Sequence, residues 1–337
     1  MIATGVVVRP AGLQDLEALH ALALTAGLGM TNLPPCRERL GALLAASVAA
    51  LAGERKAGSQ ILLVLEAAGE VVGTGCIFPS VGGDWPFYSY RIGRLRQTSQ
   101  ALGKVVENTI LTPVNDYDGS AEVGGLFVRP GLRGVAGGRL MARSRYLFMA
   151  EHRDWFGDRV VSELRGYQEA DGRSPFWDAV GRKFYGLEFK EADRISVGAG
   201  KQVIADLGPK YPIYLNLLPT DAALSVGQFH PDGARAHALL TEEGFRFEGC
   251  IDIFDAGPTM VADIDSLKTV RDSKASTVTE IGPCDECPEV LICAGSAETF
   301  RATRGYARGA AGELRISPEL AHTLELQIGD RVRHVEF

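Results

Sequence analysis

The first eighty residues alternate apolar runs with amphipathic stretches. Val6–Pro10 is a short apolar run that predicts a strand, and the apolar residues between Leu13 and Leu24 recur at helical spacing. A second helix is predicted over Arg37–Leu51. The apolar runs Ile61–Glu66 and Val71–Phe78 are separated by the turn residues Ala-Ala-Gly-Glu and predict a hairpin. The predicted order is therefore strand, helix, helix, strand, strand.

A glycine-rich stretch follows, between a predicted strand and a predicted helix. Apolar residues in Gly119–Pro130 indicate the strand, Gly131–Gly138 contains four glycines, and helical spacing then runs from Leu140 to about Phe156. Backbone N–H groups in such a turn, at the positive end of a helix, form an anion site suited to a phosphate or pyrophosphate. An ordinary corner without any ligand fits the same pattern, because a glycine-rich turn alone is a weak signal.

The second half of the chain changes from helix–strand units to short strands. Arg159–Arg165 predicts a buried strand, and Gly172–Phe184 a polar loop that enters a helix with Pro175 in its first turn. Ala234–Phe254 predicts a helix followed by a strand, and Leu314–Arg333 a strand, a helical turn and a returning strand. We expect one domain over residues 1–258, including a second helix–strand unit from about residue 200, and a small β-rich subdomain over 259–337.

Composition is that of an ordinary globular protein with a sizeable core. Of the 337 residues, 46% are apolar and 23% are charged. The formal net charge of -7, without a basic patch, argues against nucleic acid as a partner. No apolar run reaches membrane-spanning length and the start has no apolar leader, so we expect a cytoplasmic protein with no membrane partner.

Cysteine spacing bears on metal binding and redox state. Among the 6 cysteines, Cys284 and Cys287 have the spacing of half a zinc site, and Cys293 lies close by. A second Cys/His pair at zinc spacing is missing, so no metal site is expected. We expect the cysteines to be reduced thiols.

The glycine-rich turn resembles the acyl-CoA signature of the GNAT superfamily, Arg/Gln-x-x-Gly-x-Gly/Ala at the start of its central helix. Arg133–Gly138 carries the matching residues, with Ala136 in place of one glycine. The resemblance implies an α+β fold whose mixed, largely antiparallel central sheet is flanked by helices. It also implies that the strand end and the turn hold the acyl-CoA, at Leu126, Phe127, Val128, Arg133, Gly134, Gly137 and Gly138.

Longer segments, in the same order along the chain, are similar to the arginine N-succinyltransferase family. Its members transfer succinyl from succinyl-CoA to the α-amino group of L-arginine, a step of arginine catabolism. The matching segments are Tyr88–Gly93, Leu126–Phe127, Ser144–Phe148, Glu163–Gly166, Gly172–Trp177, Val226–Pro231 and Asp252–Pro258. The resemblance runs from the N-terminus to about Ser273 and resumes in the last strands. It implies succinyl-CoA as co-substrate.

Two functional residues are implied by this resemblance. His230 matches the family's proton-donor histidine, and Leu126 matches its succinyl-CoA contact. With an unperturbed pKa of about 6.5, a histidine exchanges protons near neutral pH. Taken without the family, His230 would more simply be a histidine packed into a turn. Asp232 is expected to be the N-cap of the helix from Gly233.

Charged residues in or near these segments are candidates for the remaining roles. Glu122, on the central strand, is a second possible proton acceptor, with a solvated strand-end carboxylate as the alternative. The carboxylates of the succinyl group and of the acceptor each call for an arginine or lysine. The candidates for these contacts are Arg91, Arg165, Arg173 and Lys201.

The acceptor's guanidinium calls for carboxylates. Asp252 and Asp255 are the first candidates, with Asp116 and Glu122 also available. Taken alone, each of these charged residues more often belongs to an ordinary surface ion pair.

Three interpretations of function stay open. The first is a catalytic arginine N-succinyltransferase, as a homo-oligomer or a heteromer with a related chain. The second is a related N-acyltransferase using another acyl-CoA or ornithine, since Val123–Gly125 and Ala136–Gly137 differ from the family where donor contacts would lie. The third is a non-catalytic subunit of a two-chain enzyme.

Overall fold

The computed structural model describes residues 5–26, 32–56, 58–83, 85–130, 137–192, 195, 207–284, 286–310 and 312–337. Contacts divide the chain into two compact units. Unit 1 comprises Met1–Ser80, Ser120–Val160 and Asp263–Phe337, and unit 2 comprises Val81–Gly119 and Val161–Ala262. Each unit is therefore built from segments that are far apart in the sequence. The division expected between residues 258 and 259 stays a prediction.

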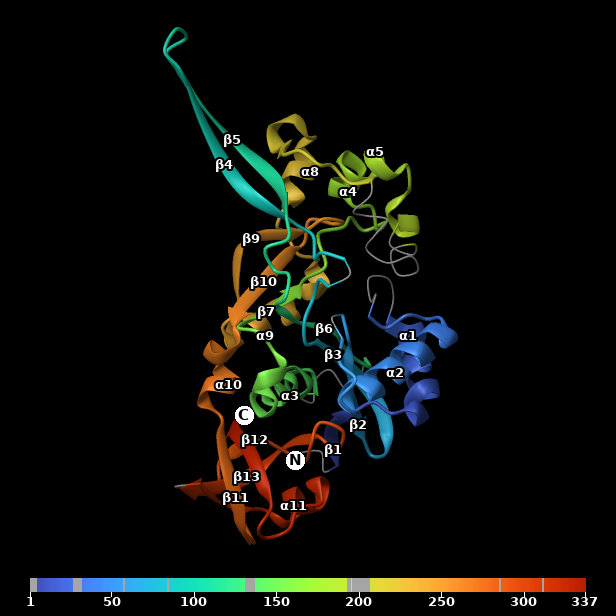
Figure 1. The fold of residues 1–337 in the computed structure, drawn as a ribbon, viewed down its shortest axis with the longest axis vertical. Coiled ribbons are helices and arrows are strands. Elements are labelled where there is room, and N and C mark those ends of the chain that lie inside the picture. Colours follow the sequence, from blue (N-terminus) through green and yellow to red (C-terminus); the bar gives the residue numbers. More distant parts are fainter. Residues whose placement is uncertain are drawn as a thin grey trace. The chain divides into compact units, whose positions relative to one another are not determined.

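An antiparallel sheet with helices on both faces forms the first part of unit 1 (Figure 1). Its strands, in spatial order, are β1 (Val6–Pro10), β2 (Ile61–Ala67), β3 (Glu70–Phe78) and β6 (Ala121–Val128). One face is covered by α1 (Leu16–Ala26) and α2 (Arg37–Leu51). Leu62 and Val64 of β2, two residues apart, form a buried cluster with Leu19 and Leu44 of these helices. The predicted order strand, helix, helix, strand, strand is confirmed.

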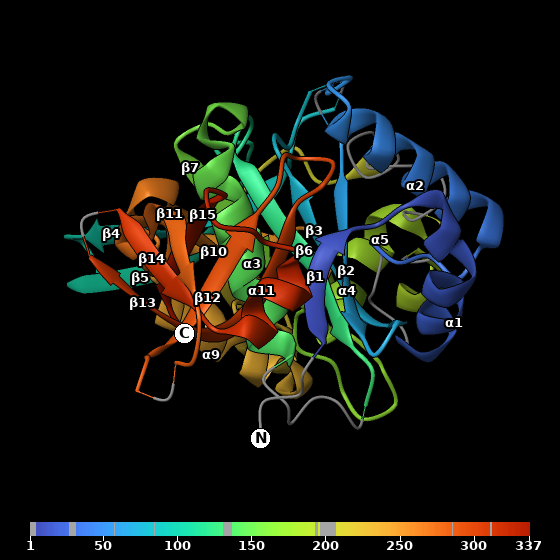
Figure 2. The ribbon, with the colours of Figure 1, turned by 90° about the horizontal axis from the view of Figure 1, so that it is seen from below.

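Helix α3 (Gly137–Glu151) packs on the opposite face of the same strands, as the view in Figure 2 also shows. Gly75 of β3 permits this approach, because an added Cβ would lie 2.9 Å from the sulfur of Met141. The predicted helix reached Phe156, but α3 ends at Glu151. His152 leaves the helical conformation, and a 3-10 turn over Arg153–Trp155 follows.

The C-terminal strands of unit 1 form a mixed sheet that joins the N-terminal one. They are β11 (Lys274–Ile281), β12 (Glu289–Ala294), β13 (Arg301–Ala310), β14 (Glu313–Ile316) and β15 (Arg331–Glu336). β11 runs parallel to β14, and β13 pairs with β1 through Ala302 and Val8. Apolar residues of these strands and of α11 (Pro318–Leu324) form one buried cluster. The strand, helical turn and returning strand expected near the C-terminus are present as β14, α11 and β15.

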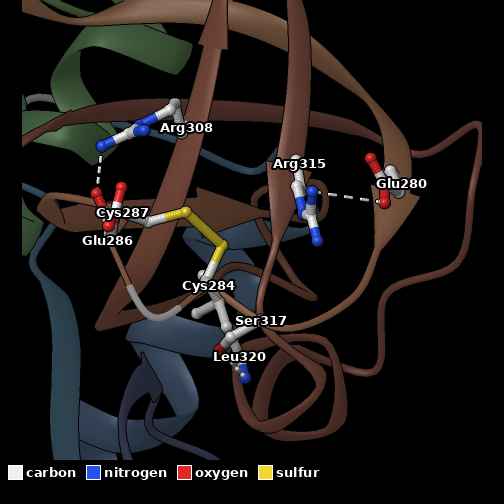
Figure 3. Close-up of a disulfide and its surroundings, with 8 residues drawn as sticks. All are labelled: Glu280, Cys284, Glu286, Cys287, Arg308, Arg315, Ser317 and Leu320. Carbon is white, nitrogen blue, oxygen red and sulfur yellow. Dashed lines mark hydrogen bonds and ion pairs between the residues drawn. A yellow bond between two sulfur atoms is a disulfide. The ribbon is translucent and has the colours of Figure 1, made fainter.

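A disulfide joins Cys284 to Cys287 in the segment between β11 and β12 (Figure 3). The expectation that the cysteines are reduced is therefore wrong for these two. A turn in which Cys287 N–H donates to the Cys284 carbonyl at 3.1 Å brings their Cα atoms to 5.0 Å, within the range that a disulfide spans. Cys36, Cys76, Cys250 and Cys293 are free thiols.

Unit 2 is organised around a long antiparallel hairpin. Its strands, in spatial order, are β10 (Pro258–Asp263), β9 (Arg246–Asp252), β4 (Ser89–Ser99), β5 (Lys104–Val114) and β8 (Ile213–Tyr214). β9 pairs with only the first three residues of β4, Ser89–Arg91, so the hairpin continues beyond it (Figure 1). Tyr90 and Ile251 of these strands pack against Phe176 in the core of the unit.

Short helices and loops complete unit 2. Among the described residues of this unit, the helices are α4 (Pro175–Ala179), α5 (Gly181–Tyr185), α8 (Thr220–Ser225) and α9 (Ala234–Glu243). Pro175 occupies the first turn of α4 as predicted, after the N-cap Ser174. Strand β7 (Arg159–Glu163) crosses from unit 1 to unit 2 along the sequence. Among the described residues, no helix has the length and apolar character needed to cross a membrane.

Candidate active site

Strand β6 carries a β-bulge at Gly125 and Leu126. The register with β3 shifts there, so that two residues of β6 face the single residue Gly75 of β3. Gly125 has a φ of +58°, a left-handed value that glycine adopts without strain. A bulge disrupts the ladder and leaves its extra residue unpaired. Leu126 therefore lies where β6 can offer backbone hydrogen-bonding groups to a ligand.

The other predicted acyl-CoA contacts lie at the end of β6, in the glycine-rich turn and at the start of α3. Phe127 and Val128 are buried, and their contact with acyl-CoA stays a prediction. Gly137 and Gly138 are the first residues of α3. Arg133 and Gly134 are outside the described residues, so the anion site in this turn stays a prediction.

Glu122 lies beside the bulge on the same strand. It is paired across the sheet with Phe78, and its Oε1 lies 3.4 Å from where a Cβ on Gly124 would stand. The half-buried carboxylate therefore lies beside Gly124, where the Nδ2 of Asn32 is closer still, 2.8 Å from the same Cβ position. Burial raises the pKa of the Cys76 thiol to about 12, and the nearby Glu122 charge acts in the same direction.

In unit 2, His230 is held by a short antiparallel pairing with the segment after β7. Gly166 forms a bridge with Phe229, and the His230 N–H donates to the Arg165 carbonyl at 2.8 Å. The ring of His230 caps a 3-10 turn over Pro231–Gly233, because its Nδ1 accepts from the Asp232 N–H at 3.2 Å. The expectation that Asp232 caps the following helix is wrong, since the residue at that N-cap is Gly233.

These surroundings favour a neutral His230 ring with its proton on Nε2. Burial lowers the pKa of His230, the Arg165 charge lowers it further, and the Asp232 carboxylate opposes them. An Nδ1 that accepts a hydrogen bond must be unprotonated, which places the proton of the neutral ring on Nε2. The side chain keeps 18% of its surface exposed, so the ring can meet a substrate.

Asp255 bonds to the backbone of the same region. Its Oδ2 accepts from the Gly166 N–H at 2.7 Å and its Oδ1 from the Gly257 N–H at 2.9 Å. The segments approach so closely that a Cβ on Gly166 would lie 2.2 Å from the Asp255 carbonyl oxygen. Burial and then the charge of Asp252 raise the pKa of Asp255. Both carboxylate oxygens already have donors, which favours a structural role over contact with an acceptor guanidinium.

Asp252 is bonded in a similar way to the turn that follows it. Its Oδ1 accepts from the N–H groups of Phe254 at 2.6 Å and Asp255 at 3.0 Å. The predicted contact of Asp252 with a substrate stays a prediction.

Of the three arginines predicted to bind substrate carboxylates, Arg165 is the one without a carboxylate partner among the described residues. Its Nη2 donates to Oε1 of Gln168, and its buried Nε has no hydrogen-bond partner there. Arg91 instead pairs with Asp116 at 2.6 Å. Arg173 binds three carboxylates, those of Glu169, Asp178 and Asp221.

The structure thus brings His230, Arg165 and Asp255 together in unit 2, and Glu122 and Leu126 together in unit 1. Lys201 lies outside the described residues. One residue near Leu126 was missed by the sequence-based prediction. Arg145 of α3 is buried below β6, and its Nη1 donates to the Gly124 carbonyl at 3.1 Å. A charged residue one turn after Met141, on the apolar face of the predicted helix, was the available signal.

Comparison with known proteins identifies the family. The family model described as "Arginine N-succinyltransferase beta subunit" matches residues 6–269, and the one for its C-terminal domain matches residues 273–336. The chain belongs to the arginine N-succinyltransferase beta subunit family. This match spans both the bulge of β6 and the His230 turn.

Individual relatives match over nearly the whole chain. The chain is 39% identical over 331 residues to arginine N-succinyltransferase subunit beta of Pseudomonas aeruginosa, covering 98% of this chain and 97% of that one. It is 37% identical over 340 residues to arginine N-succinyltransferase of Yersinia pestis, with the same coverage. The solved structure of arginine/ornithine succinyltransferase subunit AI from Pseudomonas aeruginosa superimposes with a TM-score of 0.88 at 34% identity, covering 99% of each chain. The predicted α+β fold class is confirmed.

Proposed function

We propose that this chain is an acyl-CoA-dependent N-acyltransferase that transfers succinyl from succinyl-CoA to the α-amino group of L-arginine. The observation that carries the proposal is the end-to-end match, at 39% identity over 98% of the chain, to the arginine N-succinyltransferase subunit beta of Pseudomonas aeruginosa. The bulge of β6 supports it, because transfer from a thioester needs backbone donors near the carbonyl that becomes an oxyanion. Leu126 is our candidate for that contact.

His230 is our candidate for moving protons. The attacking amine must lose a proton and the departing thiolate must gain one. A neutral ring can accept the first proton and an imidazolium can supply the second, so one histidine can serve both steps. The lowered pKa of His230 supports this role, because it keeps the ring neutral before the amine attacks. Glu122 is the alternative acceptor of the amine proton.

Arg165 is our candidate for holding the α-carboxylate of the acceptor. Its guanidinium has no carboxylate partner among the described residues, and its charge is close enough to His230 to lower the pKa of that ring. A guanidinium binds a carboxylate through two parallel hydrogen bonds, which would fix the amino group beside the carboxylate.

Release of free CoA in the presence of succinyl-CoA and L-arginine tests the activity directly. We expect succinylarginine and CoA in equal amounts. His230→Ala should lower kcat by about 10²- to 10⁴-fold, the usual contribution of a general acid–base group. His237→Ala is the matched control, because that ring stacks on Phe229 in the same region, 4.6 Å between centroids. No CoA release with any basic amino acid, or full activity in His230→Ala, would falsify this assignment.

A second candidate is that activity requires another, related chain. The family is that of a beta subunit, which favours this possibility. Native mass measurement and an activity assay of the isolated chain distinguish the two. A chain that binds succinyl-CoA but releases CoA only after a related chain is added would be a subunit of a two-chain enzyme.

Ornithine is the alternative acceptor. The relative of known structure from Pseudomonas aeruginosa is named an arginine/ornithine succinyltransferase subunit, which covers both amino acids. Comparing kcat/KM for the two amino acids decides which is preferred.

A further inference from the structure

Arg145 is a buried cation whose hydrogen bonding is incomplete. Its residue surface is 4% exposed, and burial lowers its pKa. Within the described part of the chain it makes one hydrogen bond, from Nη1 to the Gly124 carbonyl, and no ion pair. The buried Nε has no partner there. A guanidinium has five N–H donors, so the described residues use only a small part of its capacity to donate hydrogen bonds.

A buried guanidinium destabilises the fold unless an opposite charge and further hydrogen bonds compensate for its removal from water. A charge removed from water is destabilising by several kcal/mol when it lacks an opposite charge and hydrogen bonds. Arg143, on the same helix and 5% exposed, also has a buried nitrogen, Nη2, without a hydrogen-bond partner among the described residues, but its Nε donates to the Thr269 hydroxyl at 2.8 Å. Arg9 of β1 pairs with both Asp15 and Glu66. Arg145 has no carboxylate partner among the described residues, and its guanidinium carbon lies 5.9 Å from the centre of the Tyr146 ring. An arginine in this state at this depth indicates an anionic ligand more than a structural role.

The position of Arg145 relates this ligand to the bulge. Gly124, whose carbonyl it holds, immediately precedes Gly125 and Leu126. Its Cδ lies 3.4 Å from where a Cβ on Gly75 would stand, and Gly75 is the residue that faces the bulge. The guanidinium thus lies within one residue of the backbone groups assigned to the thioester carbonyl.

We propose that Arg145 binds the terminal carboxylate of the succinyl group and so selects a dicarboxylic acyl donor. The proposal rests on the proposed function. In succinyl-CoA two methylene groups separate the thioester carbonyl from a free carboxylate, so a donor held at Leu126 carries its negative charge a short distance away. A guanidinium in a site shielded from water binds this carboxylate through paired, charge-assisted hydrogen bonds. A monocarboxylic acyl group of the same length leaves Arg145 unpaired.

The test compares two acyl donors in the full-length protein. Butyryl-CoA has a four-carbon acyl group like succinyl-CoA but lacks the carboxylate. Arg145→Gln keeps a donor for the Gly124 carbonyl and removes the charge. We expect it to lower kcat/KM for succinyl-CoA, and to weaken succinyl-CoA binding in calorimetry, by about 10- to 100-fold, the range for a charge-assisted hydrogen bond. Butyryl-CoA should change by less than about threefold, because it never forms that bond. Arg145→Lys should recover part of the succinyl-CoA preference.

Arg143→Gln is the matched control, because the residue type, helix and burial are the same. It should leave the ratio of the two donors unchanged. Equal losses for both donors in Arg145→Gln would overturn the proposal and give Arg145 a structural role.

Calorimetry distinguishes failure of the proposed activity from failure of the proposed role of Arg145. If the wild-type chain releases no CoA, the proposed function fails, whereas the difference in donor binding between wild type and Arg145→Gln still decides the role of Arg145. If Arg145→Gln does not fold, Arg145→Lys takes its place in the test. A ratio of kcat/KM for succinyl-CoA to that for butyryl-CoA equal to the wild-type ratio would then contradict bidentate binding of the carboxylate by Arg145.

Discussion

The bulge of β6 and the region around Asp255 each hold a charged side chain against the backbone, but they satisfy that charge to different degrees. Both oxygens of Asp255 accept backbone N–H groups, from Gly166 and Gly257. Arg145 gives one hydrogen bond to one carbonyl and keeps a buried Nε without a partner in the described chain. A fully bonded charge holds two segments together, whereas an incompletely bonded one is available to a ligand. Substitution of Asp255 should therefore lower the stability of the fold, whereas substitution of Arg145 should weaken binding of the acyl donor.

The largest expected effect is on stability, in Asp255→Ala. Removing the carboxylate leaves the Gly166 and Gly257 N–H groups without their acceptor, which should lower the free energy of unfolding by about 2–4 kcal/mol. Denaturant unfolding measures this, and Asp255→Asn, which keeps one oxygen acceptor, should lose less. A loss of arginine binding at unchanged stability would instead place Asp255 at the substrate.

Asp255 should also make stability depend on pH. Its folded pKa is raised, so the folded state binds the proton more tightly than the unfolded state does. This contribution is fully present below the unfolded pKa of about 4 and is lost as pH rises through the higher folded value. Asp255→Asn should lack that part of the pH dependence of unfolding. An identical pH dependence in wild type and variant would contradict the raised pKa.

The next effect concerns Arg165 and Arg145, neither of which has a carboxylate partner among the described residues. Arg165→Met should raise KM for L-arginine about 10- to 100-fold and leave KM for succinyl-CoA unchanged, because its guanidinium is assigned to the acceptor carboxylate. Arg145→Gln should show the opposite pattern. Steady-state kinetics with each substrate varied in turn measure both. If both variants affect the same substrate, the separate assignment of the two arginines is wrong.

The smallest effect is on the pH profile. The acid limb of kcat/KM should lie below pH 6.5, because burial and Arg165 lower the pKa of His230 in the ligand-free protein and the neutral ring is the active form. Asp232→Asn removes a charge that opposes this lowering, so the limb should move a few tenths of a pH unit further down. The exposed Asp232 carboxylate, 3.6 Å from Nδ1, limits the size of the shift. A shift of the acid limb to higher pH in Asp232→Asn would contradict the effect assigned to Asp232 on the pKa of His230.

Local pattern was sufficient for much of the fold. Apolar spacing predicted β1, α1, α2 and the β2–β3 hairpin, and the pair Gly124–Gly125 within a strand is the kind of signal that marks a bulge. Period and turn chemistry act over a few residues, so they can be read before the tertiary structure is known. The family followed from longer ordered segments, and the match over the whole chain confirms it.

What only the tertiary structure decided is which charges meet. Arg91, Arg165 and Arg173 were equivalent candidates in the sequence, yet the fold pairs Arg91 with Asp116 and surrounds Arg173 with three carboxylates. The sequence could not reveal the partners of Asp255, because Gly166 lies 89 positions away from it. Burial and ion pairing depend on contacts between distant segments, whereas strands, helices and turns depend on neighbours along the chain. The sequence by itself therefore determined the elements and the family, and the fold determined that Arg165 and Arg145 have no carboxylate partner among the described residues.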